Sequence, residues 1–288
     1  MNWTLIFLEG AGIAVLAYVL KKRGAFKKYQ RKPVLEQRIA RLGRNQISYL
    51  RGSKKGPTVL LLHGFAADKE QWLEVAPLLE QADYQVVAPD LPGFGANFRD
   101  TEGVYDAAGL ARQLRAFAKE ADLGMFHLVG HGIGAIVAAS YAYAFPVELA
   151  SLTLIEPLGI AVPIDSELDR QLKAKRNPFL VGSAAAYDSL LAFVTVTPPV
   201  IPAAKKKQRA EALANDRPFY TQVWSKLMEG DRGKLLDLLL PEIKVRTLAV
   251  FGGKSRVVNP MTAKMIERRM EHNASTVVIP DCGHWIEL

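Results

Sequence analysis

Five residues near the middle of the chain, Gly130-His131-Gly132-Ile133-Gly134, constrain its fold more than any other segment. The apolar run at 125–129 before them has the length of a buried strand. Residues 133–145 are rich in alanine and have no glycine or proline after Gly134, which favours a helix. Alternate glycines allow a sharp turn of the backbone. The segment therefore predicts a strand, a tight turn and a helix, with residue 132 held at the top of the sheet.

Phosphate-binding loops also place a glycine-rich turn between a strand and a helix. The segment 130–134 lacks the lysine and the serine or threonine of a P-loop, and its glycines do not have the G-x-G-x-x-G spacing of a dinucleotide-binding loop. The turn alone does not decide what it binds, so its interpretation depends on the rest of the chain.

Three other predicted strands end in short motifs that carry glycine, aspartate or histidine. One strand leads into His-Gly-Phe at 63–65, a second into Asp-Leu-Pro-Gly-Phe-Gly at 90–95, and a third precedes His284 near the C-terminus. Together with the turn at 130–134, these motifs resemble the landmarks of the α/β-hydrolase family, of the lipase and esterase branch, in the same order along the chain. Among its members, the chain resembles membrane-anchored bacterial lipases and phospholipases.

The resemblance covers residues 44–288 and implies an α/β-hydrolase fold, in which a mostly parallel sheet carries helices on both faces. Strands are expected at 58–62, 84–88, 125–129, 152–155, 247–251 and 275–279. The family places a helical cap between the sixth and seventh strands. The expected division is an N-terminal transmembrane helix with a basic segment (1–32), a first part of the core (33–156), a cap insertion (157–244) and a second part of the core (245–288).

The same resemblance implies a site from which one side chain is missing. Hydrolases of this family attack an ester carbonyl with a serine that a histidine deprotonates, while two backbone N–H groups bind the oxyanion. His284 matches the base, and the N–H groups of Phe65 and Ile133 match the oxyanion donors. Gly132 stands at the nucleophile position, where it supplies no attacking atom. No metal or cofactor is implied, and the supporting residues are His63, Gly64 and His131.

The acid that orients the histidine is altered as well. The family usually places an aspartate shortly after the seventh strand, and Ser255 occupies that position here. Some relatives carry the acid at the end of the sixth strand, where this chain has Glu156. Two hypotheses for Glu156 carry equal weight: it orients His284, or it caps a helix or pairs with a lysine of the cap.

No other side chain is expected to replace the nucleophile. His131 is expected to point into the fold, and Ser255 is expected to lie behind the histidine. Cys282 is expected to be a small packing residue and not a catalytic thiol. Because loss of the serine of a triad costs on the order of 10⁶ in kcat, ordinary ester turnover is not expected.

The N-terminal residues predict a single-pass membrane anchor. Residues 3–20 contain one charge, Glu9, and as a helix they would span about 27 Å, close to the hydrocarbon thickness of a bilayer. Residues 21–32 carry seven positive charges and no acid, which predicts a body on the cytoplasmic side of a bacterial inner membrane. The remaining 30 basic and 29 acidic residues balance, which argues against nucleic-acid binding. A homodimer through the anchor is a hypothesis based on Gly10, Ala14 and Ala17.

The expected cap combines several prolines with apolar side chains, among them Phe179, Phe193, Trp224 and residues 238–240. These residues predict a lid packed on the body, a wall for an acyl or other apolar ligand, or both. Three functions remain open. The first is a membrane-anchored protein that binds such a ligand, or a protein partner, without turnover. The second is a carboxylic ester hydrolase of lipase, phospholipase or thioesterase type with substituted nucleophile and acid. The third is a non-hydrolytic enzyme with His284 as general base.

Overall fold

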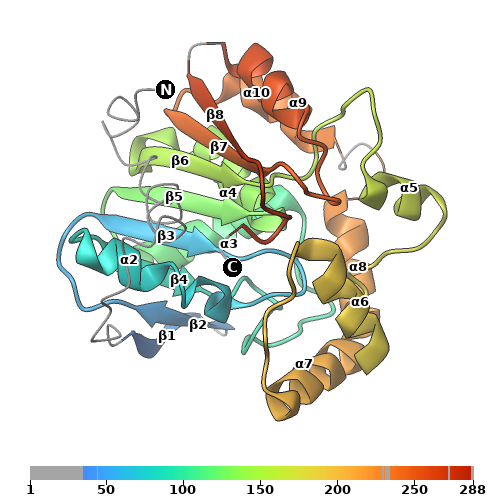
Figure 1. Ribbon diagram of the computed structural model, residues 1–288. Coiled ribbons are helices and arrows are strands. Elements are labelled where there is room, and N and C mark those ends of the chain that lie inside the picture. The colour runs from blue at the N-terminus through green and yellow to red at the C-terminus, as the bar shows by residue number, and fades with distance from the viewer. Residues whose placement is uncertain (1–34, 44, 229, 231–233, 272, 287–288) are drawn as a thin grey trace.

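The computed structural model describes residues 35–286 except 44, 229, 231–233 and 272 (Figure 1). Within these residues, eight strands form one sheet in the order β1-β2-β4-β3-β5-β6-β7-β8. The strands are β1 Glu36–Leu42, β2 Asn45–Arg51, β3 Thr58–Leu62, β4 Gln85–Pro89, β5 Phe126–His131, β6 Leu149–Ile155, β7 Thr247–Gly252 and β8 Ala274–Ile279. β2 runs antiparallel to β1 and β4, and all other neighbours are parallel. The expected mostly parallel sheet is confirmed.

The six predicted strands correspond to β3 to β8, and their bounds differ from the predicted ones by at most three residues. These strands are apolar runs because most of them are covered on both faces. The hairpin of β1 and β2 was not predicted. Most residues of β1 are exposed, since β1 lies at the edge of the sheet, and its sequence therefore lacks an apolar run.

Helices cover both faces of the sheet. Alternate residues of β3 point to opposite faces, so Leu60 and Leu62 join one hydrophobic core while Val59 and Leu61 join another. The first core contains residues of α3 (Ala107–Glu120), α4 (Ile133–Ala144) and α10 (Thr262–Met270), and the second contains residues of η2 (Lys69–Trp72) and α2 (Ala76–Gln81). Residues 133–142 of α4 are all buried, so the start of this helix is held firmly against the sheet.

Between β6 and β7 the chain forms a group of helices. Their bounds are α5 Glu167–Lys173, α6 Ala184–Val194, α7 Ala203–Asn215, α8 Arg217–Met228, α9 Leu235–Leu239 and η5 Leu240–Glu242, and a short η3 at Pro146–Glu148 precedes β6. We call residues 157–244 the insertion. In Figure 1, α6, α7 and α8 lie together beyond the ends of the central strands to which the arrows point. Phe179, Phe193 and Trp224 are buried, whereas Leu238, which was also expected to supply apolar packing surface, is 70% exposed.

The predicted membrane anchor at 3–20 and the basic segment at 21–32 lie outside the described residues. Among the helices that the structure does describe, none is long and apolar enough to cross a bilayer.

Candidate active site

The turn predicted around Gly132 is present. β5 ends at His131 and α4 begins at Ile133, so Gly132 alone makes the turn between them. Its backbone angles, φ 56° and ψ −113°, lie in a region that residues other than glycine rarely adopt. The Gly132 N–H donates to the carbonyl oxygen of Ile155 at 2.9 Å, which ties the turn to the end of β6.

The three glycines of this turn have different surroundings. A Cβ atom on Gly130 would lie 2.2 Å from the carbonyl oxygen of Gly134, and one on Gly134 would lie 2.6 Å from the carbonyl oxygen of His63. These two positions have no room for a side chain because α4 approaches the sheet closely. A Cβ atom on Gly132 would instead meet its nearest neighbour, the Nε2 atom of His284, at 3.5 Å. Position 132 therefore has room for a side chain that faces His284.

His284 is paired with Glu156. The Nδ1 atom of His284 lies 2.9 Å from the Oε2 atom of Glu156, and both side chains are buried. Burial, and to a smaller extent the neighbouring His131, lowers the pKa of His284 well below its ordinary value. A neutral imidazole that donates its Nδ1 hydrogen to Glu156 has a free electron pair on Nε2, on the side of Gly132. This is the state that a general base requires.

Glu156 is held by the loop that follows β7. Its Oε1 atom accepts the Gly252 N–H at 2.7 Å, and its Oε2 atom accepts the Ser255 hydroxyl at 2.5 Å. The Ser255 oxygen in turn lies 3.3 and 3.2 Å from the N–H groups of Val257 and Val258. Of the two candidate acid positions, the structure brings the side chain of Glu156 to His284 and places Ser255 behind Glu156.

The two expected oxyanion donors flank the turn. Ile133 is the first residue of α4, so its N–H has no carbonyl partner within the helix. The start of a helix also favours negative charge through the aligned peptide dipoles. Phe65 follows Gly64 in the loop after β3, and the Cα atom of Gly64 would lie 3.7 Å from a Cβ atom on Gly132. A negatively charged oxygen beside position 132 would therefore lie close to both segments.

His63 joins the loops that follow β3 and β4. Its Nε2 atom accepts the Leu91 N–H at 2.9 Å, and its Nδ1–H donates to the Gly64 carbonyl oxygen at 2.8 Å. Burial lowers the pKa of His63, although the carboxylate of Asp90 opposes this effect. The Gly64 N–H donates to the side-chain oxygen of Gln71 at 3.0 Å. His63 thus ties the backbone at Gly64, next to Phe65, to the loop that begins after β4.

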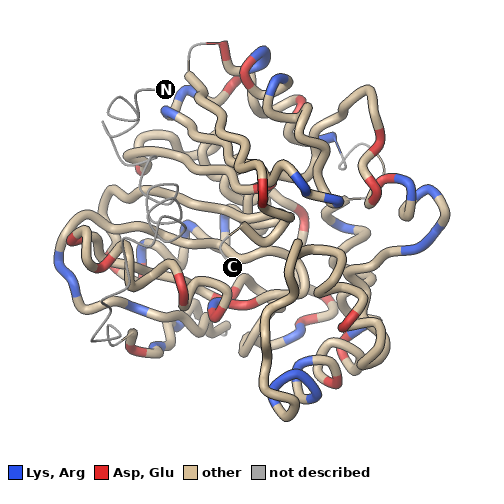
Figure 2. The backbone as a smooth tube through the Cα atoms, viewed as in Figure 1, with Lys and Arg blue, Asp and Glu red and all other residues tan. Residues whose placement is uncertain are grey.

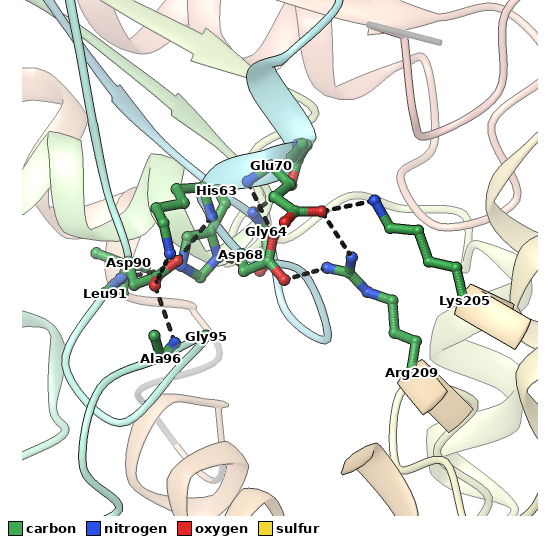
Figure 3. Close-up of polar contacts among 12 residues, drawn as sticks. His63, Gly64, Asp68, Glu70, Asp90, Leu91, Gly95, Ala96, Lys205 and Arg209 are labelled. Atoms are coloured by element: carbon green, nitrogen blue, oxygen red, sulfur yellow. Dashed lines mark hydrogen bonds and ion pairs between the residues drawn. The ribbon is translucent and has the colours of Figure 1, made fainter. Parts of the chain in front are cut away.

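A buried ion pair strengthens the same junction, and Figure 3 shows its carboxylate, Asp90, with a hydrogen bond to Ala96. Asp90 is fully buried and accepts the Lys69 ammonium at 2.6 Å, together with the backbone N–H groups of Lys69 at 2.8 Å and Ala96 at 2.9 Å. The sequence analysis identified the motif that begins at Asp90 but missed Lys69. Its signal was a lone lysine near the start of a helix, which is normally a solvent-exposed residue.

His131 points into the fold, as expected. Its Nε2–H donates to the carbonyl oxygen of His284 at 2.9 Å, and the centres of the two imidazole rings lie 4.5 Å apart. A Cβ atom on Gly64 would lie 2.6 Å from the His131 Nδ1 atom, which explains the glycine at that position. His131 therefore fixes the backbone of the loop that carries the His284 side chain.

Aromatic side chains cover the site. The ring of Phe65 contacts those of Phe94, Phe179, Tyr220 and Trp224, with centroid distances of 5.0 to 6.2 Å. Phe179, from the insertion, also lies 6.0 Å from the His284 ring. The base is consequently enclosed by apolar surface from both the body and the insertion.

Cys282 is buried in the core that also contains α2, as its expected packing role requires. In the part of the chain that the structure describes, no group of three or more histidine, cysteine, aspartate or glutamate side chains is placed to hold a metal ion. The chemistry that this site offers is a neutral imidazole base beside two backbone donors.

Comparison of the whole chain with known proteins identifies its family. The family model for the alpha/beta hydrolase fold matches residues 57–288. A monoacylglycerol lipase of Xenopus laevis is 26% identical over 265 residues, which cover 87% of this chain and 77% of that protein. Lipase 3 of Moraxella sp. (strain TA144) is 27% identical over 231 residues, which cover 80% of this chain and 72% of that protein.

Solved structures give the same result. The crystal structure of a membrane phospholipase A, described as a bacterial virulence factor, has 32% sequence identity and a TM-score of 0.83, and the match covers 94% of this chain and 85% of that chain. The structure of a putative lipase from Acinetobacter baumannii has 27% identity and a TM-score of 0.79, with 88% and 86% covered.

Proposed function

The chain belongs to the α/β-hydrolase family, and from this premise we propose that it binds an acyl or other apolar ligand beside His284 with little or no ester hydrolysis. The observation that carries this proposal is Gly132 at the turn between β5 and α4, where the family places its nucleophile. The His284 Nε2 atom faces this position, but glycine supplies no oxygen for it to activate.

The surroundings of Gly132 support a site that still recognises its ligand. The Glu156–His284 pair and the donors at Phe65 and Ile133 are of the kind that bind and polarise an ester carbonyl. Removal of a catalytic serine leaves binding and oxyanion stabilisation in place while it removes on the order of 10⁶ in kcat. The expected outcome is therefore retained affinity with strongly reduced turnover.

The ligand class follows from the walls of the site and from the relatives. Phe179 packs on His284 and forms an aromatic cluster with Phe65 and Trp224, and this apolar surface suits a hydrocarbon chain better than a polar metabolite. The relatives named above are lipases and a membrane phospholipase A, which supports an acyl lipid. The anchor expected at 3–20 would hold the body next to a source of such lipids.

A second candidate function is favoured by the state of His284. Because its pKa is lowered by burial and its Nε2 atom faces position 132, His284 is suited to act as a general base without a covalent intermediate. In an ester hydrolase of this type, water would attack the carbonyl directly. The reaction would be slower than in a serine hydrolase because water is not held as part of the protein.

The test compares hydrolysis of p-nitrophenyl butyrate and octanoate by the purified full-length chain with that by His284→Ala. Equal rates, together with fatty acids or intact lipids found by mass spectrometry in protein purified without added lipid, would support the binding function. Turnover well above the His284→Ala variant would favour the general-base function and contradict the first proposal. Absence of both turnover and bound lipid would contradict both.

A further inference from the structure

The site at Gly132 and His284 is closed in this structure. His284 is 2% exposed, the ring of Phe179 from the insertion lies 6.0 Å from its imidazole, and Trp224 stacks on Phe179 at 5.7 Å. A ligand reaches the Nε2 atom of His284 only after part of the insertion moves away from the body. The contacts between the insertion and the body therefore indicate where the site opens.

Arginine residues hold two parts of the insertion: the link at Asp216 between α7 and α8, and the helix α5. Arg99 of the body donates to the Asp216 carboxylate at 3.0 Å and the Tyr220 hydroxyl at 3.1 Å, and it also donates to two backbone carbonyl oxygens of its own loop. α5 is held by Arg256, whose guanidinium forms two hydrogen bonds with the Glu167 carboxylate at 2.6 and 2.7 Å. Such paired, charge-assisted hydrogen bonds combine strength with fixed geometry.

α7 is held in a different way (Figure 3). Arg209 contacts the Asp68 carboxylate at 2.5 Å and that of Glu70 at 3.9 Å, and the Lys205 ammonium contacts Glu70 at 2.8 Å. We call these four side chains the clasp. They are between 21% and 53% exposed, so salt screens their attraction. Asp68 and Glu70 lie three and five residues after Phe65 of the body.

The apolar attachment of α7 is small. Of its 13 residues, Ala210 and Leu213 are buried, and the blue colour in Figure 2 marks lysine and arginine positions along the backbone of the helix. The preceding residues 195–202 contain three prolines and the fully exposed Val200. α7 ends at Asn215, and α8 begins at Arg217. Besides these apolar contacts, Lys206 pairs with Asp188 of α6, and Asp216 at the C-terminal end of α7 pairs with Arg99, so the clasp is what joins the middle of α7 to the body.

A groove already separates α7 from the body. It has a volume of about 290 Å³, and its lining includes Ala67, Leu73, Ile201 and Trp285 together with Lys205 and Arg209 of the clasp. Ala67 lies two residues after Phe65, and Trp285 follows His284 in the chain. The groove is thus lined by residues that neighbour the oxyanion loop and the base in the chain, although not by Phe65 or His284 themselves, and Lys205 and Arg209 of α7 lie on its other side.

We propose that α7 is a gate to the site at Gly132 and His284, and that the clasp of Lys205 and Arg209 with Asp68 and Glu70 holds this gate closed. Release of the two cations from the carboxylates lets α7 move outward and opens the groove toward His284. Ionic strength therefore controls access. The gate operates whether the ligand is released intact or hydrolysed, so it does not depend on the proposed function.

A thiol placed in the site measures access directly. In Gly132→Cys, the new Cβ atom would lie 3.5 Å or more from its nearest neighbouring atoms, which is ordinary van der Waals contact. The rate at which iodoacetamide alkylates this cysteine reports how often the site is open. The wild-type chain, with the buried Cys282 as its single cysteine, gives the background rate. Addition of Lys205→Gln and Arg209→Gln is expected to raise the alkylation rate about two- to twentyfold. Raising sodium chloride from about 0.05 to about 0.5 M should accelerate the parent but not the clasp variant.

Two matched variants separate the clasp from general loosening of the helix. Lys207 lies on α7 and pairs with Glu211 of the same helix, so Lys207→Gln removes a charge without touching the clasp and should leave the rate unchanged. Arg209→Lys keeps the charge and should stay near the parental rate. Equal alkylation rates in the parent and the clasp variant at both salt concentrations would overturn the proposal. A rate increase in Lys207→Gln as large as that in the clasp variant would overturn it as well.

Discussion

Two positions in the site lack the side chain that the resemblance implies, and their surroundings differ. At Ser255, where an aspartate is usual, a carboxylate still reaches the base, because Glu156 contacts the His284 Nδ1 atom at 2.9 Å. At Gly132, where a serine is usual, the nearest described atom outside the turn is the His284 Nε2 atom itself, 3.5 Å from where a Cβ atom would lie. At the first position a carboxylate from the end of another strand contacts the base, and at the second none of the three nearest described atoms is an oxygen.

The difference follows from what each side chain has to do. An acid acts through a hydrogen bond to the far side of the imidazole, so a carboxylate from the end of either neighbouring strand can supply it. β6 and β7 are adjacent and parallel, and they end on the same side of the sheet. A nucleophile must instead lie at one point between the base and the oxyanion donors. The turn after β5 places Gly132 beside the His284 Nε2 atom, at such a point.

The largest expected effect comes from Gly132→Ser, which would remove the contrast between the two positions. A serine hydroxyl at this position faces His284 Nε2, so hydrolysis of p-nitrophenyl butyrate should rise by about 10³ to 10⁶ over the wild type. A residue with a Cβ atom at φ 56° is strained by about 1 to 3 kcal/mol, so the melting temperature should fall at the same time.

Gly132→Ala is the control for this gain. It carries the same backbone strain and fills the same space but has no hydroxyl, so it should lose stability equally and gain no activity. If Gly132→Ser folds and remains as inactive as Gly132→Ala, then the turn after β5 is not the nucleophile position.

The second effect concerns the acid and is measured in the Gly132→Ser protein. Glu156→Gln leaves an amide that no longer fixes the His284 tautomer, so kcat should fall by about 10² to 10⁴. Glu167→Gln, which removes a carboxylate that binds Arg256 and not His284, should change kcat little.

Restoring the usual acid sharpens this second test. Ser255→Asp added to the Glu156→Gln protein places a carboxylate at the usual position, and kcat should recover at least tenfold. No recovery would mean that the loop after β7 has lost the geometry for an acid. An aspartate at position 255 would then be unable to replace Glu156 as the partner of His284.

The sequence predicted the sheet and its central helix well, because both are built from uninterrupted apolar segments. α4 is buried along residues 133–142 and β3 along its whole length, so few polar residues interrupt the hydrophobic pattern from which each was predicted. The hairpin of β1 and β2 escaped prediction because β1 is largely exposed. Hydrophobic patterns in a sequence indicate which residues are buried, and an exposed edge strand has few buried residues.

The site was predicted less completely, because its remaining choices depend on contacts between distant residues. Ser255 and Glu156 are 99 residues apart in the chain, and the hydrogen bond between them exists because β6 and β7 pair in parallel. The sequence presented them as two alternatives for one role, whereas they lie in contact. The pairs that join Lys69 to Asp90 and α7 to the body likewise depend on how loops and helices pack together.

A third effect arises from the lowered pKa of His284. Below about pH 6.5 the unfolded chain binds a proton at this histidine while the folded chain does not, so stability should fall as the pH decreases. The slope from one such group is at most about 1.4 kcal/mol per pH unit. Urea unfolding of the wild type at pH 7.5 and pH 5.0 should therefore show lower stability at the acid pH.

Comparison with a variant isolates the contribution of His284. In His284→Gln the loss of stability between the two pH values should be smaller, although not absent, because the pKa of His63 is also lowered by burial. In Gly132→Ser, the same lowered pKa should keep His284 basic and the enzyme active at pH values below 6.5. An acid limb of activity above pH 6.5 would contradict a neutral, buried base.

The smallest effect tests whether Ser255 acts through Glu156. Ser255→Ala removes one hydrogen bond from the oxygen that also accepts from His284, so in the Gly132→Ser protein kcat should fall by less than about tenfold. The freed carboxylate oxygen interacts more strongly with the imidazolium form, and the acid limb of the pH profile should therefore move to higher pH. A fall in kcat with an unchanged acid limb would reduce Ser255 to a packing role. Position 255 would then take no part in the chemistry of the site.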